Sequence, residues 1–319
     1  MKRLMQMLAM AFALGAAMAN GQDFPRQPIR IIVPFAAGTT TDILARVVSE
    51  ELKASLGQPV HVENRSGATG LVGAGMLARA PADGYTIGIG NEATHVTLPL
   101  LRKVAYDPLN DFTPLTMATR TTLAIAVNPS MLPVHDLPGL IAAAKTRADG
   151  VSFGARGEGS PPQLIGELLK QRTGARFVHV PYEGSSPALE DLLAGRLAMV
   201  ISTLPMLAPH QDRLRIIAVA DAVRVPAFPG VQSIAETLPD VVVPGWSGFF
   251  APAMLPPAIA AKLSSALAAA LHKPAVAQAL RKRAFEPVGG PPEELRELVS
   301  SGQQRWAPVL AKVPMPKLD

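Results

Sequence analysis

The chain has 319 residues, of which 48% are hydrophobic and 17% are charged, and its formal net charge is +5. This length allows two domains, and this hydrophobic content excludes a disordered chain. The absence of cysteine excludes disulfides, a lipid anchor on an N-terminal cysteine and a thiol nucleophile. The densest basic cluster, Arg281-Lys282-Arg283, lies in a helical pattern and indicates a solvated helix face, so we expect no nucleic-acid partner.

Residues 1–19 have the pattern of a secretory signal peptide. Lys2 and Arg3 give a positive start, an apolar stretch follows, and Ala17-Met18-Ala19 fits the small-residue cleavage rule. The apolar stretch is too short to span a bilayer, and no later stretch reaches about 18 residues. The sequence therefore predicts export to the periplasm and a soluble mature chain that begins near Asn20.

Strand-like and helix-like segments alternate along the mature chain. The predicted strands cover residues 29–35, 60–63, 86–90, 123–127, 151–154, 177–180, 199–202, 214–220 and 249–251. The predicted helices cover residues 42–56, 70–79, 137–147, 161–171, 186–193, 257–272, 274–283 and 292–307. This alternation is typical of an α/β fold with mostly parallel sheets and helices on both faces. Ligands of such sheets bind beyond the carboxyl ends of the strands, so the loops that follow strands are the candidate sites.

The most informative loop, residues 35–42, follows the first predicted strand. Its small residues and three threonines lead into a helix whose first N–H groups lack partners and whose dipole is positive at that end. Such a terminus attracts a carboxylate or phosphate, but an ordinary turn capped by Thr41 or Asp42 has the same pattern. The candidate binding residues of this loop are Phe35, Ala37, Gly38, Thr39, Thr40, Thr41 and Asp42.

A second loop of the same kind, residues 64–70, follows the next strand and opens a helix rich in glycine and alanine. Two such loops on neighbouring strands would face each other, which favours a shared site over an ordinary turn. The candidates here are Gly67, Ala68, Thr69 and Gly70. The helix contains Gly73-x-Gly75-x-x-Ala78, but these glycines lie inside the helix rather than before it, so we expect no dinucleotide or other cofactor.

Further candidate ligand residues follow or end later strands. They are Thr94, His95, Gly159, Ser160, Tyr182, Ser185, Ser202 and Trp246. Most have a structural alternative: a lone histidine is more often a structural hydrogen-bonder, Ser160 and Ser185 or Ser186 fit helix caps, and the aromatic residues fit the core. The six histidines lack metal-ligand spacing, so no metal site is expected.

Several stretches carry a resemblance when they are taken in order. They are Pro28-Ile-Arg-Ile-Ile-Val-Pro-Phe35, Thr41-Asp-Ile-Leu-Ala-Arg46, Leu56-Gly-Gln-Pro-Val60 with Val62-Glu-Asn-Arg65, Pro81-Ala-Asp-Gly-Tyr-Thr86, Tyr106-Asp-Pro108 with Asp111-Phe112, Val178-His-Val-Pro-Tyr182, Ser186-Pro-Ala-Leu189 and Glu286-Pro-Val-Gly-Gly290. Together they resemble the periplasmic solute receptors of the tripartite tricarboxylate transporter family, the Bug receptors. The resemblance covers nearly the whole mature chain, from about Pro28 to Trp306.

The resemblance implies a type II periplasmic-binding-protein fold, with two α/β lobes around a central ligand cleft. Lobe 1 would comprise residues 25–122 and 245–319, and lobe 2 residues 123–244. It also implies a receptor rather than an enzyme, which captures a small organic carboxylate for integral-membrane transporter subunits. The ligand would bind chiefly to backbone groups and bridging waters of residues 35–42 and 66–70. The chain crossings near residues 119–123 and 242–247 would form the hinge, and a monomer is the default.

Three departures from the family's pattern concern the ligand site. Thr39 and Thr40 replace glycines of the family's first loop, which narrows the freedom of the backbone and adds hydroxyls. Glu183 stands where members often have lysine, and Ser202 where many have aspartate. If that aspartate serves a ligand amino group, its replacement argues against an amino-acid ligand.

The sequence leaves two other functions open. A periplasmic sensing module for a membrane signalling partner would share the fold and the ligand. A secreted α/β hydrolase would need a nucleophile and a base together in the cleft, with Ser160, Ser185 and His95 as candidates.

Overall fold

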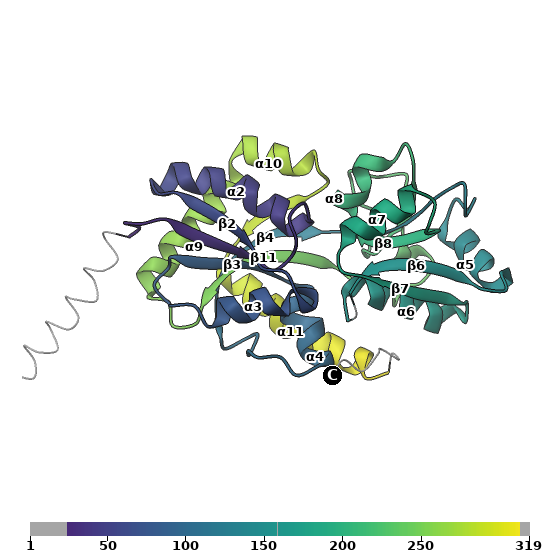
Figure 1. The fold of residues 1–319 in the computed structure, drawn as a ribbon, viewed down its shortest axis with the longest axis horizontal. Helices are drawn as coiled ribbons and strands as arrows, with labels where there is room; N and C mark the ends of the chain where they lie inside the picture. The colour runs from purple at the N-terminus through teal and green to yellow at the C-terminus, as the bar shows by residue number, and fades with distance from the viewer. Residues whose placement is uncertain (1–23, 158, 313–319) are drawn as a thin grey trace, which may run out of the picture.

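The computed structural model describes residues 24–157 and 159–312, and the predicted signal peptide lies outside them. The chain forms two α/β lobes side by side, each built on one six-stranded sheet (Figure 1). Within the described ranges, no helix is long and apolar enough to cross a membrane.

The sheet of lobe 1 takes strands from both ends of the chain, in the order β12-β4-β11-β3-β1-β2. β1 pairs in parallel with β2 and β3, whereas β11 runs antiparallel to β3 and β4. The strands are β1 (Ile29–Val33), β2 (Val60–Asn64), β3 (Thr86–Asn91), β4 (Phe112–Thr121), β11 (Gly245–Pro252) and β12 (Glu286–Gly290).

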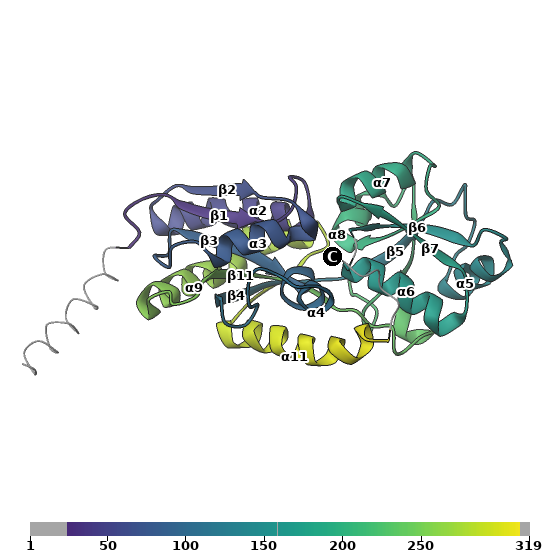
Figure 2. The same ribbon diagram turned by 60° about the horizontal axis from the view of Figure 1, so that its bottom comes forward.

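Helices cover both faces of this sheet (Figures 1 and 2). One face carries α2 (Thr40–Leu56), α9 (Pro257–His272) and α10 (Pro274–Arg281), and the other carries α3 (Leu71–Ala78), α4 (Leu98–Leu101) and α11 (Pro292–Leu310). α2 illustrates why they pack: Leu44, Val48 and Leu52 recur at helical spacing and are fully buried against the sheet.

The sheet of lobe 2 has the order β10-β9-β5-β8-β6-β7. Its strands are β5 (Leu123–Val127), β6 (Val151–Arg156), β7 (Phe177–Tyr182), β8 (Met199–Thr203), β9 (Arg215–Val219) and β10 (Gln232–Ser233). In Figure 2, α5 (Leu137–Thr146) and α6 (Pro161–Thr173) lie on one side of it, and α7 (Ser185–Leu193) and α8 (Leu204–Leu207) on the other.

The chain crosses between the two sheets twice. Thr122 alone separates β4 from β5, and the return path enters lobe 1 at Gly245, the first residue of β11. These crossings lie side by side, because Gly245 is the register partner of Thr121. A Cβ atom at Gly245 would overlap the carbonyl oxygen of Thr121, so this close approach requires glycine.

The sheets are mixed, whereas the sequence predicted mostly parallel sheets. β5 runs antiparallel to β8 and β9, as β11 does to its neighbours.

The sequence prediction also missed two strands. One is β4, a ten-residue strand whose Pro114 argues against a central position. Pro114 is tolerated because β12 pairs with β4 only from Met117 to Arg120. The other is β12, whose two glycines weaken any strand pattern.

Phe249 offers a test of the core of lobe 1. Its side chain is fully buried in the middle of β11, so replacement by alanine should leave a cavity and lower the free energy of unfolding by about 3–5 kcal/mol. Val223→Ala, at a side chain that is 71% exposed, should change it by less than about 0.5 kcal/mol. Urea unfolding followed by circular dichroism measures both, and equal effects would contradict the described core.

Candidate ligand cleft between the lobes

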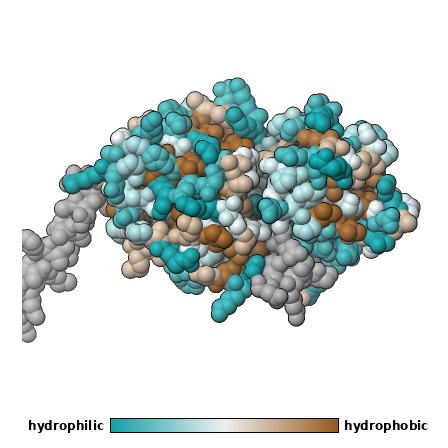
Figure 3. All heavy atoms as spheres, in the orientation of Figure 1, coloured by the Kyte–Doolittle hydropathy of each residue, from teal (hydrophilic) through white to brown (hydrophobic). Residues whose placement is uncertain are grey.

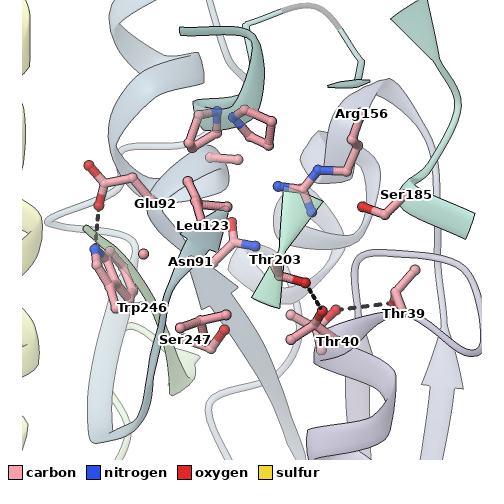
Figure 4. A pocket seen from close by; sticks show the side chains of 16 residues that line it. Thr39, Thr40, Asn91, Glu92, Leu123, Arg156, Ser185, Thr203, Trp246 and Ser247 are labelled. Atoms are coloured by element: carbon pink, nitrogen blue, oxygen red, sulfur yellow. Dashed lines mark hydrogen bonds between the residues drawn. The ribbon is translucent and has the colours of Figure 1, made fainter. Parts of the chain in front are cut away.

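A cleft of about 620 Å³ lies between the lobes. Lobe 1 contributes residues 34–37, 39 and 66–70, and lobe 2 contributes residues 156–157, 181–184, 186 and 187. A smaller chamber of about 40 Å³ adjoins the cleft, and Thr39 and Arg156 line both spaces (Figure 4). The two loops that the sequence predicted to share a site therefore line one cleft.

The loop after β1 leads directly into α2. The helix begins at Thr40, and Thr39 is its N-cap residue without a side-chain cap hydrogen bond, so the prediction of Thr41 or Asp42 as the cap was wrong. Thr39 instead donates its hydroxyl to the carbonyl of Ala36 at 2.7 Å. Thr40 and Thr41 line the chamber, and their N–H groups have no acceptor within the described residues.

Asp42 stabilises the conformation of this loop through hydrogen bonds. Its buried carboxylate accepts hydrogen bonds from the Gly38 N–H (2.8 Å), Asn64 Nδ2 (2.9 Å) and Arg46 Nε (3.0 Å). Burial raises the pKa of Asp42, but these hydrogen bonds outweigh burial and leave the pKa below its usual value. Neither Gly38 nor Asp42 lines the cleft or the chamber, so both support the loop rather than face the cleft as predicted.

The loop after β2 adopts a left-handed turn. Four successive residues have positive φ: Gly67 (138°), Ala68 (45°), Thr69 (55°) and Gly70 (100°). The N–H groups of Ala68 and Thr69 have no acceptor within the described residues. Left-handed backbone is strained for residues other than glycine, and successive free N–H groups in such turns form anion-binding concavities. The turn therefore has the geometry of an anion site at the wall of the cleft.

Arg156 ends β6 and points into the chamber (Figure 4). Its guanidinium carbon lies 4.4 Å from the ring centroid of Phe35, which belongs to the other lobe. Arg156 was not among the candidates predicted from the sequence, although Gly159 and Ser160 of the same loop were. The available signal was one arginine among glycines directly after a buried strand.

Glu92 and Trp246 line the chamber at the return crossing. Trp246 Nε1 donates to the Glu92 carboxyl, which is 5% exposed. Burial raises the pKa of Glu92 to about 7, against the opposing effects of the Trp246 and Trp306 N–H groups and the charge of Arg305. Trp246 lies in a wall of the chamber and also belongs to the hydrophobic core, so both of its predicted positions apply.

Direct contacts join the two lobes across the cleft. Thr40 and Thr203 share a hydrogen bond of 2.6 Å between their hydroxyls, and the Thr97 hydroxyl donates to the Gly159 carbonyl at 3.1 Å. With the Phe35–Arg156 contact, these interactions connect the two lobes in this structure.

Thr94 and His95, two predicted ligand residues, lie instead in the core of lobe 1. His95 is 1% exposed and stacks on Phe250 with ring centroids 4.2 Å apart. Burial lowers its pKa to about 3, so the ring is neutral. Thr94 bonds to His95 Nδ1 and to Asn91. Neither residue lines the cleft or the chamber, because the turn after β3 directs them inward.

Some of the predicted residues of lobe 2 line the cleft or the chamber, and the others lie outside both spaces. Tyr182 lines the cleft while its hydroxyl donates to Asp191 at 2.7 Å, and Ser185 lines the chamber as the first residue of α7. Ser160 caps α6 and lies outside both spaces, as does Gly159. Ser202 is buried in β8 and also lies outside them.

The structure brings further residues to the site that sequence reasoning did not propose. They come from strand ends and from α7: Asn91, Glu92, Leu123, Arg156, Ser186, Thr203 and Ser247. Thr203 and Ser247 had no local signal, because only the pairing of β5 with β8 and of β11 with β3 brings them to the chamber.

The site offers no assembled catalytic or metal centre among the described residues. No group of three or more histidine, aspartate and glutamate side chains there could hold a metal ion. The hydrogen bonds of the described ranges link neither Ser160 nor Ser185 to a histidine, since Ser160 serves as a helix cap and His95 bonds to Thr94.

Two α/β lobes, two adjacent crossings and a cleft lined by N–H groups without acceptors among the described residues are features of a two-lobed solute-binding receptor. The chain belongs to the family described as the tripartite tricarboxylate transporter family receptor, which matches residues 44–315. It is 36% identical to protein BugT of Bordetella pertussis over 317 residues, covering 97% of each chain.

Solved structures agree with this assignment. The chain is similar to R. palustris Rpa4515 with adipate (35% identity, TM-score 0.87, covering 92% of this chain and 99% of that one). It is also similar to MatC from Rhodopseudomonas palustris with bound malate (31% identity, TM-score 0.83, covering 90% and 100%). The predicted family and the type II periplasmic-binding fold are thereby confirmed.

The buried Glu92 carboxyl should make stability depend on pH. Because its folded pKa of about 7 exceeds the ordinary value of 4.5, the wild type loses stability as pH rises from 4.5 through 7 and the buried group ionises. We expect Glu92→Gln to match the wild type near pH 4.5 and to be about 3 kcal/mol more stable at pH 8. Denaturant unfolding at both pH values measures this, and a pH-independent difference would contradict it.

The Thr40–Thr203 hydrogen bond should help to hold the lobes together. Thr203→Val removes it and should shift the open–closed equilibrium toward the open form by about fivefold, as expected for one net hydrogen bond. Small-angle X-ray scattering should then give a larger radius of gyration than for the wild type. Thr203→Ser keeps the hydroxyl and serves as the control, and equal radii for all three proteins would contradict the assignment.

Proposed function

We propose that this protein is a periplasmic receptor that captures a small organic carboxylate between its lobes and presents it to membrane subunits of a tripartite tricarboxylate-type transporter. The observation that carries the proposal is the left-handed turn of residues 67–70, whose free N–H groups at Ala68 and Thr69 line a cleft between two lobes. A carboxylate oxygen is the acceptor that such a turn lacks.

The energetics support affinities in the micromolar range or somewhat tighter. Charge-assisted hydrogen bonds contribute about 1.5–3 kcal/mol each. Four of them sum to about 6–12 kcal/mol, which spans the roughly 8 kcal/mol of micromolar binding before the costs of ordering the ligand and closing the lobes are subtracted. Besides the two N–H groups of the turn, those of Thr40 and Thr41 in the adjoining chamber have no acceptor within the described residues.

Similar proteins support the ligand class. The two R. palustris structures named above hold adipate and malate, both small organic dianions. Because the chain and these proteins share the fold and about a third of their residues, a small organic acid is the best-supported ligand for the cleft.

Lobe movement is part of the proposal. Residues 25–122 and 245–319 would move as one lobe and residues 123–244 as the other, with the hinge at the two crossings. The ligand favours the closed form because only that form contacts it from both sides. The contacts Thr40–Thr203 and Thr97–Gly159 would be broken in the open form.

The protein would act outside the cytoplasm as a monomer and without catalysis. The export signal at residues 1–19 and membership of a receptor family support the first and last points. The face shown in Figure 3 mixes hydrophilic and hydrophobic residues, and the hydrophobic ones lie in separate groups rather than in one broad patch that would suit a second subunit.

Calorimetry with ligand-free protein tests this function. The protein is unfolded, dialysed and refolded, then titrated with dicarboxylates, monocarboxylates, aromatic acids and neutral amides of the same size. We expect at least one organic acid to bind with a micromolar or lower Kd, and the amides not to bind, since they lack the charge that the turn attracts. The absence of heat from every organic acid would overturn the proposal.

A further inference from the structure

The cleft contains one cationic side chain among the described residues that line it, Arg156. It projects from lobe 2, and its guanidinium carbon lies over the ring of Phe35 from lobe 1, 4.4 Å from the ring centroid. A cation–π contact of this kind engages no N–H donor in a hydrogen bond to an acceptor atom, so the guanidinium can still donate to a ligand.

No acceptor within the described residues uses these donors. Arg156 takes part in no ion pair or hydrogen bond there, and its Nε is buried without a partner. Other arginines are paired, such as Arg46 with Asp42, Arg196 with Asp191 and Arg224 with Glu236. Burial lowers the pKa of Arg156 to about 10, so it is charged at neutral pH. A largely enclosed cation without a counter-ion is costly, and an anion from outside the chain would remove that cost.

The turn of residues 67–70 is a second anion-binding element in the same cleft, on the opposite lobe. The two elements are neighbours, because Gly157, the residue after Arg156, packs against Thr69. A Cβ atom at Gly157 would overlap the Thr69 hydroxyl oxygen. One small molecule within the 620 Å³ of the cleft can therefore contact both elements.

The charges of the cleft favour a dianion. Glu183 is the acidic residue that lines the cleft, but its side chain is exposed, so water screens its charge. Glu92 lines the adjoining chamber, where its carboxyl accepts the Trp246 N–H and burial raises its pKa to about 7, so it is only partly charged at neutral pH. Asp42 lies outside the lining and its charge is balanced by Arg46. A monocarboxylate can satisfy either the turn or Arg156, whereas a dicarboxylate can satisfy both.

We propose that Arg156 is a specificity-determining residue that pairs with the second carboxylate of a dicarboxylate ligand, whose first carboxylate binds the turn of residues 67–70. This inference rests on the proposed function and names its ligand class. The guanidinium forms two parallel hydrogen bonds to the carboxylate, a geometry that lysine cannot reproduce.

The test compares matched pairs of acids: adipate with hexanoate, malate with 2-hydroxybutyrate, succinate with butyrate and phthalate with benzoate. Calorimetry on the wild type should give at least one dicarboxylate that binds about 10- to 100-fold more tightly than its partner. Arg156→Gln should remove this advantage and leave the affinity for the monocarboxylate unchanged. Arg156→Lys should retain only part of it. Arg281→Gln removes an exposed charge on α10 and should change neither affinity.

A purely structural role for Arg156 predicts other results. If Arg156 only stabilised the fold, Arg156→Gln would melt earlier without ligand, whereas removal of a cation that has no counter-ion among the described residues should leave the melting temperature unchanged or raise it. Equal wild-type affinities within every pair, or equal weakening of both acids by Arg156→Gln, would overturn the inference while the receptor function stands. Binding of no organic acid at all would overturn the function itself.

Discussion

The two adjacent crossings of the chain are the constraint on which the rest of this structure depends. Thr121 and Gly245 are register partners in the sheet of lobe 1, so the outgoing and returning paths meet at one place. The missing side chain of Gly245 allows that approach. The strands β4, β5 and β11, which adjoin the crossings, are interior strands of their sheets. The cleft and the chamber then form beside the crossings, where strand ends of both sheets converge.

Charge is distributed unevenly around the cleft, and this asymmetry gives the site its chemistry. Behind the first loop, the Asp42 carboxylate is fully satisfied by Gly38, Asn64 and Arg46 and serves the backbone. In front of it, Arg156 and the N–H groups of the second loop are not satisfied within the described residues. Buried polar groups without partners are rare in folded proteins, so the buried Nε of Arg156 marks this cleft as a place for a ligand.

Part of the site could be predicted from the sequence, because a strand that runs into a small-residue loop and a helix is a local pattern. That pattern located both cleft loops, but it could not separate residues that face the cleft, such as Thr39, from those that support it, such as Gly38 and Asp42. It also placed His95 at the site, since a histidine after a strand gives no sign that its ring stacks on Phe250. Side-chain direction in a turn depends on φ and ψ, which composition does not specify there.

The sequence by itself determined the α/β class, the alternation of elements and the resemblance to a receptor family, because each of these depends on local periodicity or on the order of short motifs. Only the tertiary structure decided that the sheets are mixed, that Thr203 meets Thr40 and that Arg156 lies over Phe35. The physical reason is separation along the chain. The Thr40–Thr203 and Phe35–Arg156 contacts join residues more than a hundred positions apart, and their energies depend on burial and mutual distance, which exist only once both lobes have packed.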